Sequence, residues 1–250
     1  MGPIYLDNAA TSFPKPPAVA EAMAHYLNDV GASINRGVYA SAQSAGLTTL
    51  LLREALCGLF RHTEATHCIL TPGNTAGLNM AIRGWLRSGD HCLVSSMEHN
   101  AVMRPLQDLA KQGVLFDRIP CDSAGRMDPA DIIPLIRPNT KLLVMAHGSN
   151  VGGAVQDAAA VGRICRERGI PFVLDAAQTA GHWDIDFEGW GLAALSVPGH
   201  KGLMGPGGIG ALLLSQDFAR GLSPILTGGT GSASDSEVQP EYMPDKFESG

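Results

Sequence analysis

Residues 141–176 read KLLVMAHGSNVGGAVQDAAAVGRICRERGIPFVLDA and place two apolar runs, KLLVMAH and PFVLDA, on either side of a helical pattern. Strands are apolar along their whole length when both faces of a sheet are covered. A strand, a helix and a strand in this order predict two parallel strands joined by a crossover helix. We therefore predict strands over 141–147 and 171–176 and a helix over 157–169.

The same alternation extends toward the N-terminus. Further strands are predicted over 67–71 and 91–96, and the helices that follow them over 75–86 and 100–112. A first helix is expected over 16–29, because prolines suit its first turn and Gly31 follows it, and a second over 41–60. The pattern predicts an α/β fold with a mostly parallel sheet covered by helices on both faces.

Composition and charge narrow the class of protein. The 250 residues are 45% apolar and 17% charged, as in globular proteins, and the formal net charge is -6. No basic run is present, so the sequence disfavours a nucleic-acid or anionic-membrane surface. The N-terminus lacks the features of a signal peptide, and no apolar run reaches about 18 residues, which predicts a cytoplasmic protein.

The five cysteines are scattered, with no CxxC pair and no Cys/His spacing typical of a zinc site. We expect buried free thiols and no metal. The last segment, TGGTGSASDSEVQPEYMPDKFESG over 227–250, is rich in small residues. It fits a flexible tail and an ordered loop equally well, and the glycines alone do not decide.

Polar residues follow each predicted strand. In sheets of this kind, ligands bind beyond the carboxyl ends of the strands, so these side chains should converge. A single polar residue after a strand is more often a cap or a loop hydrogen bond, but five successive strand ends favour a shared site. The residues are Asn74, Thr75, Glu98, His99, His147, Asn150, Asp175, Gln178, His200 and Lys201.

Lys201 lies in SVPGHKGLMGPGGIGALLL, where its glycine neighbours leave space for another group. A lysine becomes nucleophilic when its pKa falls from about 10.4, and it can then form a Schiff base with an aldehyde cofactor. The alternative is a surface lysine in a glycine-rich turn. The spacing GPGGIG over 205–210 matches a dinucleotide-binding loop, but it precedes a strand instead of opening a helix, which argues against that function.

Two further segments suit the same cofactor. Asp175 ends a buried strand, and a protonated pyridine nitrogen would supply the cation that such a carboxylate needs. The alternative is an Asp that caps the next segment. In TPGNTAGL, residues 73–75 precede a predicted helix, whose free N–H groups and Thr75 hydroxyl suit a phosphate. The alternative there is an ordinary N-cap by Asn74 or Thr75.

With these residues in place, the chain resembles class V aminotransferase-like enzymes, most of all the cysteine desulfurase and selenocysteine lyase branch. The resemblance runs from about residue 4 to the last residues, and its most specific parts are the EHN, DxxQ and GHK segments. It implies an extended arm over 1–15 and, over 16–250, the large domain of a pyridoxal 5'-phosphate (PLP) enzyme of fold type I. The segments that carry it are YLDNAATS, NRGVYASAQSAG, TPGNTAGLN, MEHNA, HGSNVGG, VLDAAQTAG and GHKGLMGPGGIG.

The resemblance also implies roles. Lys201 would hold PLP as a Schiff base, Asp175 would pair with the pyridine nitrogen, and His99 would stack on the ring. Gln178 and Asn150 would face the phenolic oxygen of the ring. The phosphate would be held by Thr75, His200 and the backbone of residues 73–75, including Asn74. Thr230, in GGTG, would reach the phosphate of the neighbouring subunit, which implies a homodimer.

The sequence departs from the family in two places. Pro198 stands where the family usually has a phosphate-binding serine, so Thr75 and His200 would hold more of the phosphate. The segment PDKFESG resembles the point where family members continue into a long helix and a C-terminal small domain. We therefore expect that domain, with its persulfide-forming cysteine and its arginine for the substrate carboxylate, to be missing from residues 1–250.

The resemblance implies PLP chemistry on an amino acid. The expected reaction converts L-cysteine to L-alanine, with the sulfur transferred as a persulfide, and a sulfur-acceptor protein is an expected partner. Two alternatives stay open. The enzyme could be an aminotransferase or a β-lyase that acts on another amino acid, because fold does not determine reaction. The chain could also be a truncated PLP-binding protein without turnover.

Overall fold

The computed structural model describes residues 4–34, 37–233 and 235–249. Parts of the predicted arm and of the NRGVYASAQSAG and 227–250 segments lie outside these ranges. The helices are α1 (Pro17–His25), α2 (Ala40–Phe60), α3 (Asn74–Trp85), α4 (Asn100–Ala110), α5 (Ala158–Arg168), α6 (Phe187–Trp190) and α7 (Gln216–Gly221). A π-helical turn (Tyr26–Val30) continues α1, and short 3-10 turns cover Ala65–His67 and Pro129–Leu135.

The strands form one seven-stranded sheet of order β1-β7-β6-β5-β4-β2-β3. Neighbours from β6 to β3 are parallel, whereas β7 runs antiparallel to both β6 and β1. The prediction of a mostly parallel sheet is confirmed. The strands are β1 (Cys68–Thr71), β2 (His91–Ser95), β3 (Leu115–Ile119), β4 (Thr140–Ala146), β5 (Phe172–Asp175), β6 (Ala194–Pro198) and β7 (Gly210–Leu214).

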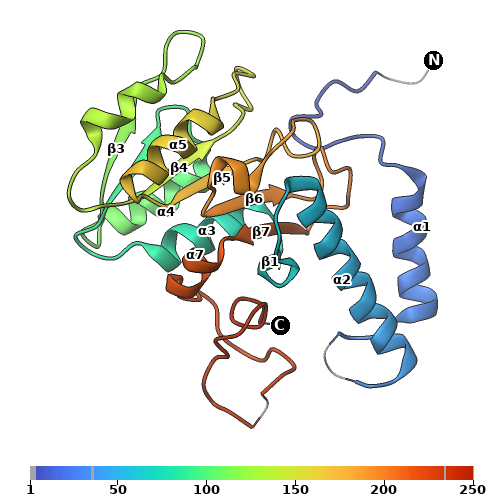
Figure 1. Cartoon of the computed structure of the whole chain (residues 1–250). Helices are drawn as coiled ribbons and strands as arrows, with labels where there is room; N and C mark the ends of the chain where they lie inside the picture. Colours follow the sequence, from blue (N-terminus) through green and yellow to red (C-terminus); the bar gives the residue numbers. More distant parts are fainter. Residues whose placement is uncertain (1–3, 35–36, 234, 250) are drawn as a thin grey trace.

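Two hydrophobic cores lie on the two faces of the sheet. Along β4, Leu143 and Met145 enter the core that holds α2 and α5, whereas Leu142 and Val144 enter the core that holds α3, α4 and α7. Because successive side chains point to opposite faces, a strand buried on both sides must be apolar throughout. Helices cover both faces, as predicted, and the ribbon shows the sheet passing between them (Figure 1).

Strand β3 was not predicted from the sequence. This strand lies at the edge of the sheet, carries Asp117 and Arg118, and buries only Ile119 fully. An edge strand that faces water does not show the apolar run by which the buried strands were recognised. The predicted helices over 16–29 and 41–60 are confirmed, with Pro17 in the first turn of α1 and a left-handed Gly31 after the π-helical turn.

The described residues of the last segment, 227–233 and 235–249, form an ordered loop and not a flexible tail. Arg53, on α2, makes a bidentate ion pair with Glu248 at 2.9 and 2.7 Å, and Glu248 also accepts from the N–H of Leu70 on β1 at 2.6 Å. Phe247 is buried in the core beside α7. These contacts fasten the end of the described chain to the β1 edge of the sheet.

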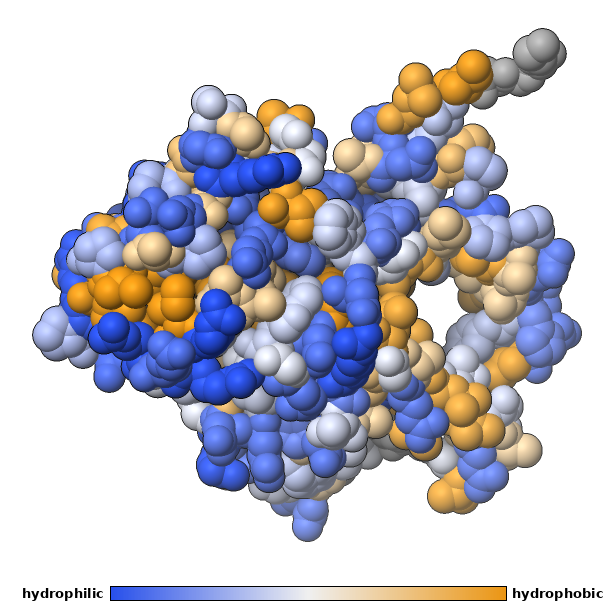
Figure 2. All heavy atoms as spheres, turned by 45° about the horizontal axis from the view of Figure 1, so that its top comes forward, coloured by the Kyte–Doolittle hydropathy of each residue, from blue (hydrophilic) through white to orange (hydrophobic). Residues whose placement is uncertain are grey.

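Large apolar side chains remain exposed on α2. Leu47, Leu50 and Leu51 are 56%, 45% and 54% exposed and, at spacings of three and four residues, form one stripe of the helix. Figure 2 shows hydrophobic residues gathered on the side that carries α1 and α2. None of the described helices is both long and apolar enough to cross a membrane.

Candidate active site

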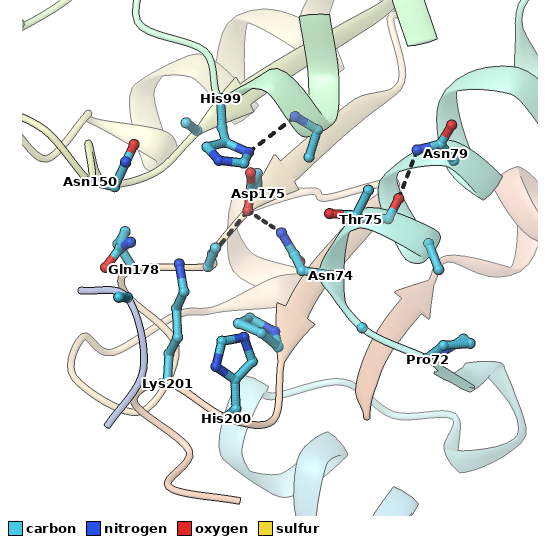
Figure 3. A pocket seen from close by; sticks show the side chains of 18 of the residues that line it. Pro72, Asn74, Thr75, Asn79, His99, Asn150, Asp175, Gln178, His200 and Lys201 are labelled. Carbon is cyan, nitrogen blue, oxygen red and sulfur yellow. Dashed lines mark hydrogen bonds between the residues drawn. The ribbon is translucent and has the colours of Figure 1, made fainter. Parts of the chain in front are cut away.

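A pocket of about 660 Å³ lies at the carboxyl ends of the parallel strands. It brings together side chains that follow β1, β2, β4 and β5 and side chains from the loop between β6 and β7 (Figure 3). The prediction that polar residues at strand ends converge is confirmed for eight residues. They are Asn74, Thr75, His99, Asn150, Asp175, Gln178, His200 and Lys201.

Three residues singled out from the sequence do not line this pocket. His147 is buried behind it, where its Nδ1 lies 2.9 Å from Thr179 Oγ1, and burial lowers its pKa to about 4. The carboxyl of Glu98 is also buried beneath the site. Thr230 lies in the 227–249 loop and contacts Ser232, so its role toward a neighbouring subunit stays a prediction.

Asp175 forms the floor of the pocket. It is 3% exposed, and its Oδ1 accepts from Asn74 Nδ2 at 2.8 Å and from the N–H of Ala177 at 3.0 Å. Its Oδ2 accepts no hydrogen bond from the described residues. Burial raises the pKa of Asp175, while these donors and the charges of His99 and Lys201 oppose the rise. A cationic N–H group in the pocket would give Oδ2 a hydrogen-bond donor and would stabilise the charge of this carboxylate.

His99 begins α4. Its Nδ1 accepts from the N–H of Ala101 at 3.0 Å, so the imidazole caps the helix. Because Nδ1 is an acceptor, the neutral ring carries its proton on Nε2. The cap therefore sets both the orientation of the ring over the pocket and its tautomer.

Lys201 is half-buried and extends into the pocket opposite Asp175 (Figure 3). Burial lowers the pKa of its ammonium group, and the charge of Asp175 partly counteracts this. A lysine with a lowered pKa holds more of its amine in the neutral, nucleophilic form at a given pH. The alternative of a freely exposed lysine in a surface turn does not fit this position.

The start of α3 forms an anion cradle. Gly73 is the N-cap, with φ 151°, and no side chain caps the helix, so the alternative in which Asn74 or Thr75 is the N-cap is wrong. The amide of Asn74 instead donates to Asp175. Within the described ranges, no hydrogen bond uses the N–H of Asn74 or Thr75. Free N–H groups at a helix N-terminus favour a bound phosphate.

Gly210 lets this cradle approach the sheet closely. A Cβ there would lie 2.6 Å from the carbonyl oxygen of Val197 and 2.9 Å from the carbonyl carbon of Gly73, so a larger residue would push α3 away. Pro198, which ends β6, also lines the pocket and offers no hydroxyl.

The N-terminal segment forms one wall of the site. Gln178 Nε2 donates to the carbonyl of Ala9 at 3.0 Å, and Lys15 Nζ donates to the carbonyl of His200 at 2.6 Å. Sequence reasoning missed Lys15, since a lone lysine in a proline-rich segment carries no pattern. The resemblance predicts that Gln178 faces the cofactor ring. In the structure, one N–H of its amide donates to the N-terminal arm at Ala9.

No cysteine among the described residues lines the pocket. Cys57, Cys68, Cys92 and Cys165 are buried free thiols, and Cys121 is half-buried. The expectation of buried thiols is therefore confirmed for four of them. Within the same described ranges, no cluster of three or more His, Cys, Asp or Glu side chains could hold a metal ion.

Comparisons with known proteins agree with this geometry. The family model described as "Aminotransferase class-V" matches residues 4–250. A "Probable cysteine desulfurase" of Methanothermobacter thermautotrophicus is 33% identical over 99% of this chain and 62% of its own length. A "Cysteine desulfurase IscS" of Vibrio cholerae is 34% identical over 91% of this chain and 57% of its own length.

Solved structures are similar as well. The apo structure of a cysteine desulfurase from Thermococcus onnurineus NA1 matches with a TM-score of 0.91 and 31% identity, over 99% of this chain and 62% of that one. A structure described as "SspA in complex with cysteine" matches with a TM-score of 0.83 and 30% identity, over 90% of this chain and 65% of that one. The chain thus spans about three fifths of the length of these relatives.

Proposed function

Because the chain belongs to the class-V aminotransferase family, we propose that it is the large, PLP-binding domain of an enzyme that acts on an amino acid, with L-cysteine as the substrate. The observation that carries this proposal is the placement of Lys201 and Asp175 in one pocket beside the free N–H groups of α3. The family and its cysteine desulfurase relatives are PLP-dependent, and the sheet and its helices have the arrangement of fold type I.

The residues of the pocket fit PLP. Asp175 has one carboxylate oxygen that no described residue satisfies, which suits a pyridinium N–H. The N-terminus of α3 and the Thr75 hydroxyl suit the phosphate. Lys201 suits the aldehyde, and the ring of His99 suits the face of the pyridine. When bound, PLP supplies an aldehyde and an electron-withdrawing ring.

The side chains then divide the work. Asp175 holds a proton on the pyridine nitrogen, because a buried carboxylate is stabilised by an adjacent cation. Lys201 Nζ, whose pKa is lowered by burial, accepts and returns the proton at the substrate Cα. His99 Nε2 is a second position for proton transfer, since its Nδ1 is engaged by Ala101.

The test is reconstitution with PLP. We expect a new absorption band on addition of PLP, and after borohydride reduction we expect peptide mapping to find the pyridoxyl group on Lys201. The Lys201→Ala variant should show neither. Covalent attachment at another lysine, or an unchanged band in Lys201→Ala, would overturn the assignment.

The substrate is tested separately, on this chain and on a longer protein that contains it. L-cysteine with a reductant should yield equal amounts of alanine and sulfide. Turnover of another amino acid but not of cysteine would identify an aminotransferase or a β-lyase instead. If PLP binds Lys201 but no amino acid turns over, the chain is a cofactor-binding domain without activity of its own.

We also propose that the chain forms a homodimer through the α2 stripe of Leu47, Leu50 and Leu51. An exposed apolar stripe of this kind is typical of an interface. Sedimentation should show a dimer, and Leu51→Glu should make it a monomer, whereas Lys111→Glu, at an exposed site on α4's C-cap, should not. A monomeric unaltered chain would contradict this. Thr230 could then be tested in the dimer by its effect on PLP affinity.

A further inference from the structure

Glu98 is a buried acid that the proposed chemistry does not use. It follows β2 and directly precedes His99. Although part of the residue is exposed, its carboxyl is not: Oε1 accepts from Ser95 Oγ at 2.6 Å and from the N–H of Ala146 at 2.8 Å. Its Oε2 is buried and has no partner among the described residues. Such an unpaired buried oxygen is costly and needs an explanation.

The bond to Ala146 extends the sheet where its backbone pairing stops. The register between β2 and β4 ends at Val94 and Val144, so no β2 carbonyl accepts from the N–H of Ala146. The side chain of Glu98 supplies that acceptor instead. It therefore ties the turn that carries His99 to the end of β4, and Ala146 itself lines the pocket.

Glu98 and Asp175 are two carboxyls beneath one pocket, and their surroundings differ. Asp175 faces the side chains of His99 and Lys201, both of which oppose the rise of its pKa, and it accepts from two N–H groups. Among the described residues, the titratable groups that act on Glu98 are Asp175 on β5 and the buried thiol of Cys92 on β2, and neither is a cation. Burial, and then the charge of Asp175, raise the pKa of Glu98 to about 8.

A proton on Oε2 lowers the cost of burying this carboxyl, because a neutral carboxyl loses far less on burial than a charged one. Two carboxyls in one site commonly divide in this way, with one neutral and the other ionised. Asp175 is the acid that lines the pocket among the described residues.

We propose that Glu98 is a positioning residue that works as a neutral acid: it fixes His99 and Ala146 at the pocket and leaves Asp175 as the negative charge of the floor. Its role toward the cofactor rests on the proposed function, whereas its neutral state does not. Glu98→Gln keeps the shape and the Oε1 acceptor without a titratable group. Glu98→Ala removes the tie.

The first measurement uses protein without cofactor. Because the pKa of Glu98 is higher in the folded chain than its usual value near 4.5, the protonated carboxyl stabilises the fold at pH values below 4.5. This contribution is lost as the pH rises from there through about 8. Relative to Glu98→Gln, the unfolding constant of the unaltered chain should rise by up to about tenfold per pH unit across that window. If the two proteins show parallel pH dependence, Glu98 is not a neutral acid.

The second measurement is PLP titration at neutral pH, followed by borohydride reduction. Glu98→Gln should bind within about twofold of the unaltered chain, and Glu98→Ala about tenfold more weakly, with rescue by Gln as the sign of positioning. Equal affinity of the Ala variant, or equal loss in both, would overturn the positioning role. If the unaltered chain fails to bind PLP at Lys201, the proposed function fails, while the unfolding data still decide the state of Glu98.

Discussion

Lys15 Nζ lies 2.6 Å from the carbonyl oxygen of His200, so a charged side chain of the N-terminal segment holds the residue that precedes Lys201. The same oxygen accepts from the N–H of Ser12 at 3.0 Å and from the hydroxyl of Thr11 at 3.0 Å. Residues 185 to 189 positions apart in the chain thus meet at one carbonyl. These hydrogen bonds join the N-terminal arm to the loop that carries His200 and Lys201.

Lys15→Met should weaken the attachment of the N-terminal arm to the loop that carries His200 and Lys201. A hydrogen bond from a charged donor contributes about 1 kcal/mol after allowance for its partial exposure, so the N–H of Ser12 should exchange about fivefold faster. Hydrogen exchange read by mass spectrometry or NMR checks this. Lys111→Met, at an exposed surface pair, is the control, and unchanged exchange at Ser12 in Lys15→Met would show that the contact contributes nothing.

Asp175→Asn should lower the pKa of Lys201 further, because the charge of Asp175 partly offsets the effect of burial. The midpoint of Lys201 acylation, followed by competitive labelling and mass spectrometry, should move to lower pH. PLP affinity should fall at least about tenfold with the loss of the charged partner. Asp217→Asn, on the exposed surface of α7, should change neither. A midpoint that moves to higher pH contradicts this account.

Thr75→Val should distinguish the contribution of the phosphate to PLP affinity from the contribution of the ring. Thr75 is exposed at the start of α3, so loss of its hydroxyl should leave the fold intact. PLP affinity should fall about tenfold, the effect of one hydrogen bond to a charged group, while affinity for pyridoxal without the phosphate should stay the same. Equal effects on both ligands would place Thr75 away from the phosphate.

Acid should destabilise the fold through His147. Its folded pKa of about 4 is lower than the usual 6.5, so its contribution is present above 6.5 and is lost as the pH falls toward 4. The loss is about 3 kcal/mol at most. Urea unfolding of the unaltered chain should therefore depend more steeply on pH in this range than that of His147→Gln. His25→Gln, at an exposed position, should match the unaltered chain.

Glu248→Ala should lower the free energy of unfolding by about 3 kcal/mol, since it leaves the buried guanidinium of Arg53 without its partner. It also removes the acceptor for the N–H of Leu70. Urea unfolding checks the value. Glu237→Ala, an exposed residue of the same loop, is the matched control. Equal stability of the two variants would mean that the loop does not support the β1 edge.

Most of the fold followed from local patterns. The apolar runs at 141–147 and 171–176 predicted strands covered on both faces, and they correspond to β4 and β5. The edge strand β3 did not follow, because its charged residues face water and leave no apolar run. The state of residues 227–249 depended on Arg53, almost two hundred residues away, which no local signal could report.

The sequence predicted most of the residues that line the site, since the carboxyl ends of parallel strands must share one edge of the sheet. Asp175 and Lys201 could be named in this way. The contacts of each residue there became known from the folded chain: Asn74 donates to Asp175 instead of capping α3, Lys15 holds His200, and Glu98 replaces a missing sheet carbonyl. The physical reason is that strand order sets position over long stretches of chain, whereas hydrogen bonds and pKa values depend on contacts of a few ångströms between segments far apart in sequence.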